Sequence, residues 1–124
     1  LRAHPGVYLA GQVSGVEGYV ESAALGLVLG ATLGTELVRG QPVAPPPPET
    51  ALGALRGHLR TPREDFQPSN VVWSMFPPLA SPFVTTPKGK RRKLGKRERR
   101  EAKAERALSA LPAWLDTVAV TPGQ

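Results

Sequence analysis

The sequence predicts an α/β fold from three features near its beginning. A short apolar run, Val7–Ala10, follows a His-Pro-Gly turn signal and is typical of a buried strand. Gly11 and Gly15 then mark a glycine-rich turn, and a long helical pattern runs from about Gly18 to Gly34. A strand that leads through glycines into a helix is a building unit of α/β proteins.

Length and composition limit what the chain can be. Its 124 residues allow one small domain at most. The 13 glycines and 14 prolines are many for a compact domain, whereas an apolar content of 40% is ordinary for globular proteins. With no cysteine and two isolated histidines, the sequence predicts no disulfide and no metal site, and it is compatible with a cytoplasmic location.

The helix predicted over Gly18–Gly34 is apolar on nearly every side, which indicates a buried helix. Its charge-free core, Ser22–Thr35, is shorter than the about 20 apolar residues that span a bilayer, so we expect no membrane segment. One helical row contains only small residues: Gly18, Ser22, Gly26, Gly30 and Gly34. Each glycine costs about 1 kcal/mol of helix propensity, so we expect another element to approach this row closely.

The middle of the chain predicts a connection, a helix and a strand. Residues 42–48 contain five prolines and should be extended. A second helix is expected over Glu49–Arg60, ended by Thr61-Pro62. Val71–Phe76 predicts a strand, stopped by two prolines.

The last third predicts an irregular segment, a helix and a frayed end. We expect Ser81–Gly89 to be irregular and Lys96–Leu111 to be helical. Ala107, Leu108, Leu111 and Trp114 should dock this helix and its continuation on the body. The last three residues, 122–124, should fray.

Positive charge is concentrated between Lys88 and Arg106. This segment has eleven basic and three acidic residues, a net charge of +8, whereas the remainder has five basic and seven acidic residues, a net charge of −2. From Arg92 to Arg106, only Arg97 and Glu101 form an opposite pair at helical spacing. Such a segment repels itself unless a polyanion neutralises it. We therefore favour nucleic-acid binding over a solvated face, through Lys90, Arg91, Arg92, Lys93, Lys96, Arg97 and Arg100.

A membrane surface is a weaker alternative, because Leu94 is the single bulky apolar residue between Lys88 and Arg106.

The glycine turn at the start of the first helix is a candidate binding site. Backbone N–H groups and the helix dipole at such a point suit an anion or an electron-rich acceptor. The spacing of Gly11, Gly15 and Gly18 is not the G-x-G-x-x-G of dinucleotide-binding units. Spacing alone leaves both a cofactor contact and a plain close-packed turn open. Glu17 and Glu21 share a helix face and can form an acid/base pair or simply favour the dipole.

The stretch Leu9–Ala24 resembles the second flavin-binding signature of the bacterial folate- and FAD-dependent tRNA (uracil-5-)-methyltransferases. Thr50–Leu55 and Phe66–Asn70 agree with the same family, as does Phe76–Leu79. Arg99–Leu108 is similar to the basic C-terminal helix of that family. The chain departs from the family pattern at three positions: Ser69, Val72 and Ser74.

This resemblance implies a fold, an activity and a set of contacts. The fold would be the C-terminal part of a glutathione-reductase-like FAD-binding domain, incomplete on its own. The whole enzyme would use FAD, methylenetetrahydrofolate and NAD(P)H to methylate C5 of a T-loop uridine in tRNA. Gly11, Gln12, Gly15, Val16 and Glu17 would contact the flavin. No catalytic residue is assigned within this chain.

The family's N-terminal G-x-G-x-x-G motif is not in this sequence, and the non-Met start agrees with a C-terminal portion. We therefore expect the chain to need an N-terminal part of the same enzyme and to be inactive alone. The expected divisions are residues 1–40, the flavin unit; 41–87, which completes the domain; and 88–124, the basic helix and tail. Two alternatives remain: a fragment of the related flavoprotein that modifies wobble uridine, and a non-catalytic basic RNA-binding module.

Overall fold

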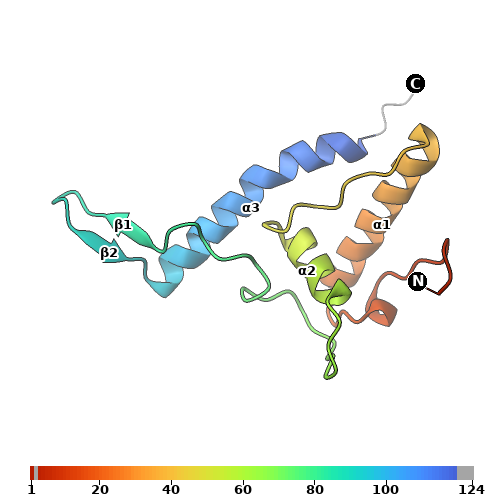
Figure 1. Ribbon diagram of the computed structural model, residues 1–124, viewed down its shortest axis with the longest axis horizontal. Helices are drawn as coiled ribbons and strands as arrows, with labels where there is room; N and C mark the ends of the chain where they lie inside the picture. The colour runs from red at the N-terminus through yellow and green to blue at the C-terminus, as the bar shows by residue number, and fades with distance from the viewer. Residues whose placement is uncertain (2, 120–124) are drawn as a thin grey trace.

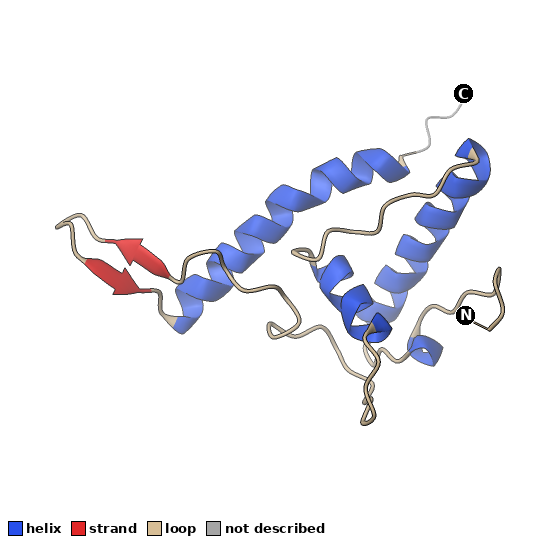
Figure 2. Ribbon diagram, in the orientation of Figure 1, coloured by secondary structure: helices blue, strands red, loops and turns tan. Residues whose placement is uncertain are grey.

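The structure is a computed structural model that describes residues 1 and 3–119. A 3-10 turn at Gln12–Ser14 precedes three helices and one hairpin. The elements in chain order are α1 (Tyr19–Arg39), α2 (Ala51–Arg60), β1 (Phe83–Thr85), β2 (Arg91–Lys93) and α3 (Lys96–Val118). Helices dominate, and the hairpin projects beyond the N-terminal end of α3, away from α1 (Figure 1). The expected α/β class is therefore confirmed in coarse form, as a small helix-rich structure with a two-stranded antiparallel sheet (Figure 2).

Helix α1 forms where the sequence predicts a helix and extends one turn further, to Arg39. Gly40 ends it in the left-handed conformation (φ 66°), and its N–H donates to the Glu36 carbonyl. The expectation that the helix is buried all round is wrong. Leu25 and Val28 are buried, but Leu27 is 71% exposed. Helices α2 and α3 contact α1 on part of its circumference only, so the described residues leave its other side uncovered.

The row of small residues on α1 lies open along most of its length. A Cβ added at Gly26, Gly30 or Gly34 would meet nothing within 4 Å. The close approach expected at this row is therefore made at its start, where a Cβ at Gly18 would lie 2.5 Å from the Asn70 side-chain oxygen, and not at these three glycines. By length and composition, α1 is also apolar enough to cross a membrane, with a mean hydropathy of 1.2 in its best window. The expectation that this segment is too short to span a bilayer is therefore wrong by length and composition, because the helix continues past Thr35 to Arg39.

Both strands expected from apolar runs are absent from these segments. Val7–Ala10 belongs to no strand, and Tyr8 is 52% exposed, because no neighbouring strand among the described residues is available to pair with this run. Val71–Phe76 contains a turn, in which the Met75 N–H donates to the Val72 carbonyl at 3.0 Å. A strand needs a partner, and neither run has one here.

The hairpin begins in the segment expected to be irregular: β1 lies within Ser81–Gly89, and β2 follows in the basic segment. Phe83 pairs with Lys93, Val84 with Arg92 and Thr85 with Arg91. The turn closes around Gly89, whose φ of 73° favours glycine. The charged β2 strand explains why an apolar pattern did not reveal it.

The second helix and the proline-rich connection are as predicted. Helix α2 begins after Thr50, whose hydroxyl accepts from the Gly53 N–H at 3.0 Å, and it ends at Arg60. Residues 42–47 form no helix or strand and connect α1 to α2. They pack so closely on α2 that a Cβ at Gly53 would lie 2.0 Å from the Pro47 carbonyl oxygen. Leu55 of α2 joins Val16 and Leu25 in the core.

Helix α3 begins at Lys96 as predicted and continues through Pro112 to Val118. Trp114 docks it: the side chain is 5% exposed, and its Nε1–H donates to the Ala44 carbonyl at 2.9 Å. The prediction that Leu108 also docks on the body is wrong, because its side chain is 70% exposed. The frayed end expected at 122–124 lies outside the described residues.

The core assignment predicts different effects for two leucines. Leu55→Ala should lower the free energy of unfolding by about 2–5 kcal/mol, or leave the chain unfolded, because it opens a cavity at a side chain only 2% exposed. Leu37→Ala, at a side chain 85% exposed, should change it by about 0.5 kcal/mol or less. Urea unfolding followed by circular dichroism measures both. Equal losses at the two positions would contradict this core.

Candidate functional site

The glycine turn has a backbone that requires glycine at two points. Gly11 (φ 79°) and Gly15 (φ 103°) flank the 3-10 turn. The Ser14 hydroxyl donates to the Gly11 carbonyl at 2.6 Å, so Ser14 stabilises the turn. A Cβ at Gly15 would lie 2.5 Å from the Phe66 ring. The turn is thus tightly fixed against the segment that follows α2.

An isolated parallel bridge ties this turn to the loop after α2. The Glu17 N–H donates to the Ser69 carbonyl at 3.3 Å, and the Ser69 N–H donates to the Gly15 carbonyl at 3.4 Å. The Glu21 carboxylate accepts from the Val71 N–H at 3.2 Å. Glu21 therefore holds the loop rather than pairing with Glu17 as an acid/base couple.

The five residues proposed to contact a flavin lie together in this turn. Gly11 and Gly15 offer backbone atoms, and the exposed Gln12 side chain donates to the Glu17 carbonyl at 3.2 Å. Glu17 is exposed. Val16 differs, because its side chain is 1% exposed and packs in the core. Only the backbone of Val16 is therefore available to a ligand.

Two observations show that the turn fits an electron-rich ligand atom. Helix α1 has no side-chain cap at Gly18, so the N–H groups of its first turn have no side-chain partner there. The Ser22 hydroxyl is buried with no hydrogen-bond partner among the described residues, and its Cβ lies beside Gly11. Such an orphaned group costs about 1–3 kcal/mol, which an acceptor from a ligand would relieve. Sequence reasoning missed this role, because Ser22 appeared only as a member of the small-residue row.

The basic segment forms an arm, defined here as the β1–β2 hairpin and the first turns of α3 (residues 83–100). Within it, the Arg92 guanidinium makes two hydrogen bonds to Glu98, at 2.5 and 2.7 Å. Glu98 also accepts from the Gly95 N–H at 2.8 Å. Hydrogen bonds from Arg92 and then from Gly95 lower the pKa of Glu98 to about 2. Arg92 and Glu98 are six residues apart, so pairing at the helical spacings of three or four residues does not predict this ion pair.

The seven predicted nucleic-acid contacts divide into three groups. Arg92 and Arg97 are paired, the latter with Glu101 at 2.7 Å as its spacing predicts. Arg91 lies over the Phe83 ring, 4.5 Å from its centroid. The others are exposed and form no ion pair within the described chain: Lys90, Lys93, Lys96 and Arg100.

Two further basic residues of α3, Lys103 and Arg106, bind backbone carbonyls of the loop at residues 73–78. The Lys103 ammonium donates to the carbonyls of Trp73 and Phe76, at 3.1 and 3.2 Å. The Arg106 guanidinium donates to the Pro77 and Pro78 carbonyls, at 2.7 and 2.8 Å. Trp73 and Phe76 stack on each other, with ring centroids 5.2 Å apart. This loop clamp binds α3 to the segment that continues from the Ser69 bridge.

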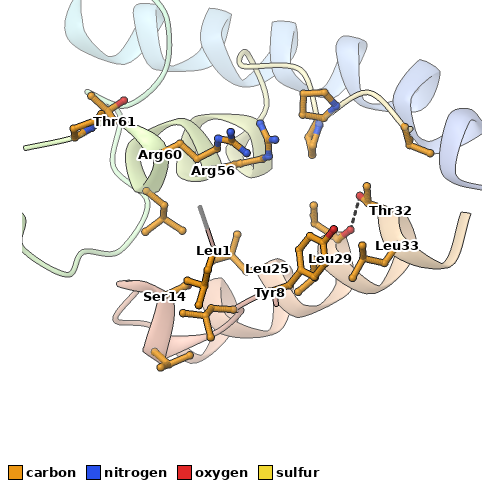
Figure 3. A pocket seen from close by; sticks show the side chains of 18 of the residues that line it. Leu1, Tyr8, Ser14, Leu25, Leu29, Thr32, Leu33, Arg56, Arg60 and Thr61 are labelled. Carbon is orange, nitrogen blue, oxygen red and sulfur yellow. Dashed lines mark hydrogen bonds between the residues drawn. The ribbon is translucent and has the colours of Figure 1, made fainter. Parts of the chain in front are cut away.

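A cavity of about 910 Å³ lies between α1 and α2 (Figure 3). Leu25 and Leu29 line one side, and Arg56 and Arg60 line the other. Burial, and then the nearby Arg60 charge, lower the pKa of Arg56. Among the described residues, no group of three His, Asp or Glu side chains gathers that would hold a metal ion.

The chain is similar in sequence to one family model and to several named proteins. Residues 1–40 match the family model described as "Glucose inhibited division protein A". The chain is 47% identical, over 98% of its length, to a protein of Anaeromyxobacter dehalogenans (strain 2CP-1) named methylenetetrahydrofolate--tRNA-(uracil-5-)-methyltransferase TrmFO. The predicted resemblance is confirmed. TrmFO proteins of Rhodopseudomonas palustris and Geobacter sulfurreducens are 45% and 47% identical over 93% and 95% of the chain.

The matches cover only part of each TrmFO relative. The chain spans 25% of the A. dehalogenans protein, 26% of the R. palustris protein and 25% of the G. sulfurreducens protein. It therefore spans about a quarter of the length of the curated relatives that it matches.

The Glu98 carboxyl predicts a pH dependence of the arm. A depressed pKa in the folded chain stabilises the arm fully above the ordinary value of 4.5, and this contribution is lost as pH falls from there through about 2. NMR titration should give a Glu98 midpoint near 2. Arg92→Gln should return it toward the ordinary range. A wild-type midpoint near 4.5 would show that the Arg92–Glu98 pair does not form.

The two glycine environments predict opposite effects of the same substitution. Gly15→Ala should lower the free energy of unfolding by about 1–3 kcal/mol, because φ is 103° and the new Cβ would clash with Phe66. Gly26→Ala should raise it by up to about 1 kcal/mol, because the Cβ would enter open space on α1. Urea unfolding distinguishes them. A neutral Gly15→Ala change would contradict the described turn.

Proposed function

We propose that this chain is the C-terminal portion of a folate- and FAD-dependent tRNA (uracil-5-)-methyltransferase. In that role it contributes a flavin-contacting turn and a tRNA-binding arm. The observation that carries the proposal is the 45–47% identity to TrmFO proteins over 93–98% of the chain. The match to the "Glucose inhibited division protein A" model covers residues 1–40 only. This contrast in coverage favours the methyltransferase over the wobble-uridine flavoprotein and over an isolated RNA-binding module.

The glycine turn is the proposed flavin contact. Gly11, Gly15 and Val16 would approach the ring through their backbones, and Gln12 and Glu17 would lie at its exposed side. The Ser22 hydroxyl adds a donor at the same place. In the whole enzyme FAD, reduced by NAD(P)H, would supply the chemistry that moves a one-carbon unit from methylenetetrahydrofolate to uridine C5. The fold would be part of a glutathione-reductase-like domain, and a cytoplasmic location goes with this function.

The open side of α1 is the proposed contact with the N-terminal part of the enzyme. The side chains of Val20, Leu27 and Leu37 are 79%, 71% and 85% exposed. The glycine row beside them leaves room for a backbone to approach. The A. dehalogenans relative is about four times as long as the match, so the remainder of such a protein could cover this surface. The proposed divisions of the chain remain 1–40, 41–87 and 88–124.

The exposed cations of the arm are the proposed tRNA contacts. Lys90, Lys93, Lys96 and Arg100 have no carboxylate partner within the described chain, so phosphates can replace water around them. Arg91, whose guanidinium lies over the Phe83 ring, is a further proposed tRNA contact. Arg92 and Arg97, which are paired with glutamates, shape the arm and contribute less net charge.

The proposal predicts that flavin binding requires both parts of the enzyme. Alone, the chain should retain no FAD and transfer no methyl group to tRNA. Mixed with the A. dehalogenans relative lacking its matching quarter, the chain should restore a flavin absorbance band to the purified complex. Gly15→Ala should reduce flavin retention at least tenfold, and Leu108→Ala, at an exposed position of α3, should leave it unchanged.

Two outcomes would contradict this account. One is flavin retention and folate-dependent methyl transfer by the chain alone. The other is a complementing partner that binds the chain while the complex still excludes flavin.

A further inference from the structure

The two faces of the β1–β2 hairpin differ in what they present. Side chains of directly paired residues share a face, so Phe83 and Lys93 lie on one face together with Thr85 and Arg91. The placement of the Arg91 guanidinium over the Phe83 ring agrees with this register. The other face carries Val84 and Arg92.

The Arg92 face is held by the protein itself. The two hydrogen bonds from Arg92 to Glu98 fasten it to the first turn of α3. The Leu94 N–H donates to the Pro82 carbonyl at 2.7 Å and closes the base of the hairpin. The hairpin is therefore anchored at its base and through one face, and the Phe83 face is left for a partner.

The Phe83 face combines a flat surface with positive charge. Phe83 is 42% exposed, although Arg91 lies 4.5 Å from its centroid. All six residues of the two strands are exposed. Lys93 is the direct cross-strand partner of Phe83, so the two side chains are neighbours on this face. An aromatic ring beside a stacked guanidinium is the surface on which unpaired bases stack, and a neighbouring lysine suits the phosphate.

We propose that the Phe83–Arg91 pair is a stacking platform for an unpaired base of RNA, with Lys93 on the adjoining phosphate. The proposal rests on the proposed tRNA contact of the arm and deepens it, because the cations alone would hold any RNA backbone. Single-stranded RNA is favoured over an anionic membrane, because the face offers one aromatic ring and no cluster of bulky apolar side chains to insert. Double-stranded RNA buries its bases and would not use the platform.

The test compares two RNAs on the 124-residue chain: a short single-stranded oligonucleotide and a blunt duplex of equal charge, by fluorescence anisotropy over a range of salt. Phe83→Ala should weaken single-strand binding roughly 5- to 150-fold, the range of one lost base stack, and leave duplex binding and the salt slope unchanged. Phe83→Tyr should restore binding, since it keeps the ring. Val84→Ala, on the opposite face, is the matched control and should have no effect.

A lysine variant separates this inference from the proposed function. Lys93→Gln should lower the single-strand salt slope by about 0.7, because one phosphate contact is lost. If it does while Phe83→Ala changes nothing, the platform is overturned and the tRNA contact stands. If neither RNA binds, both fall. Equal weakening of single strand and duplex by Phe83→Ala overturns stacking, as would binding of phosphatidylserine vesicles that Phe83→Ala abolishes while RNA binding persists.

Discussion

The short parallel bridge between Gly15–Glu17 and Ser69 is the contact on which the arrangement depends. It fixes the glycine turn from one side, while Val16 inserts its side chain into the core with Leu25 and Leu55. The loop that leaves the bridge is then held at its carbonyl groups by Lys103 and Arg106 of α3. The turn proposed for the flavin and the helix that carries the arm are therefore both hydrogen-bonded to the same loop, residues 69–78.

This connection explains how a chain with little core keeps two surfaces in place. The basic residues of the arm and of α3 differ in their contacts: Lys103 and Arg106 close the loop clamp, and Arg92 and Arg97 pair with glutamates. Four others are exposed and have no carboxylate partner within the described chain: Lys90, Lys93, Lys96 and Arg100. Net charge alone would treat them as one group, whereas the hydrogen bonds separate them. The turn contributes no lysine or arginine, so the site proposed for the cofactor and the site proposed for RNA differ in chemistry as well as in position.

The helices were predictable from sequence, and the strands were not. Apolar periodicity and the Thr61-Pro62 stop are local signals, so α1, α2 and α3 form close to the predicted ranges, although α1 continues past Gly34 to Arg39. A strand depends on a partner elsewhere in the chain, so Val7–Ala10 and Val71–Phe76 failed, and the hairpin was hidden by its charged β2 strand. The glycine turn predicted from the sequence is present, flanked by Gly11 and Gly15. The Ser22 hydroxyl, the Arg92–Glu98 pair and the loop clamp depend on tertiary packing and were missed.

The central claim is that one chain carries two separate surfaces, an arm for RNA and a turn for the cofactor. The most direct measurement is the change in backbone amide NMR signals when tRNA is added to the isotopically labelled chain. The account predicts changes concentrated in residues 83–100, with the amides of residues 11–18 unaffected. Changes centred on the glycine turn, or an arm whose signals do not respond to tRNA, would contradict it.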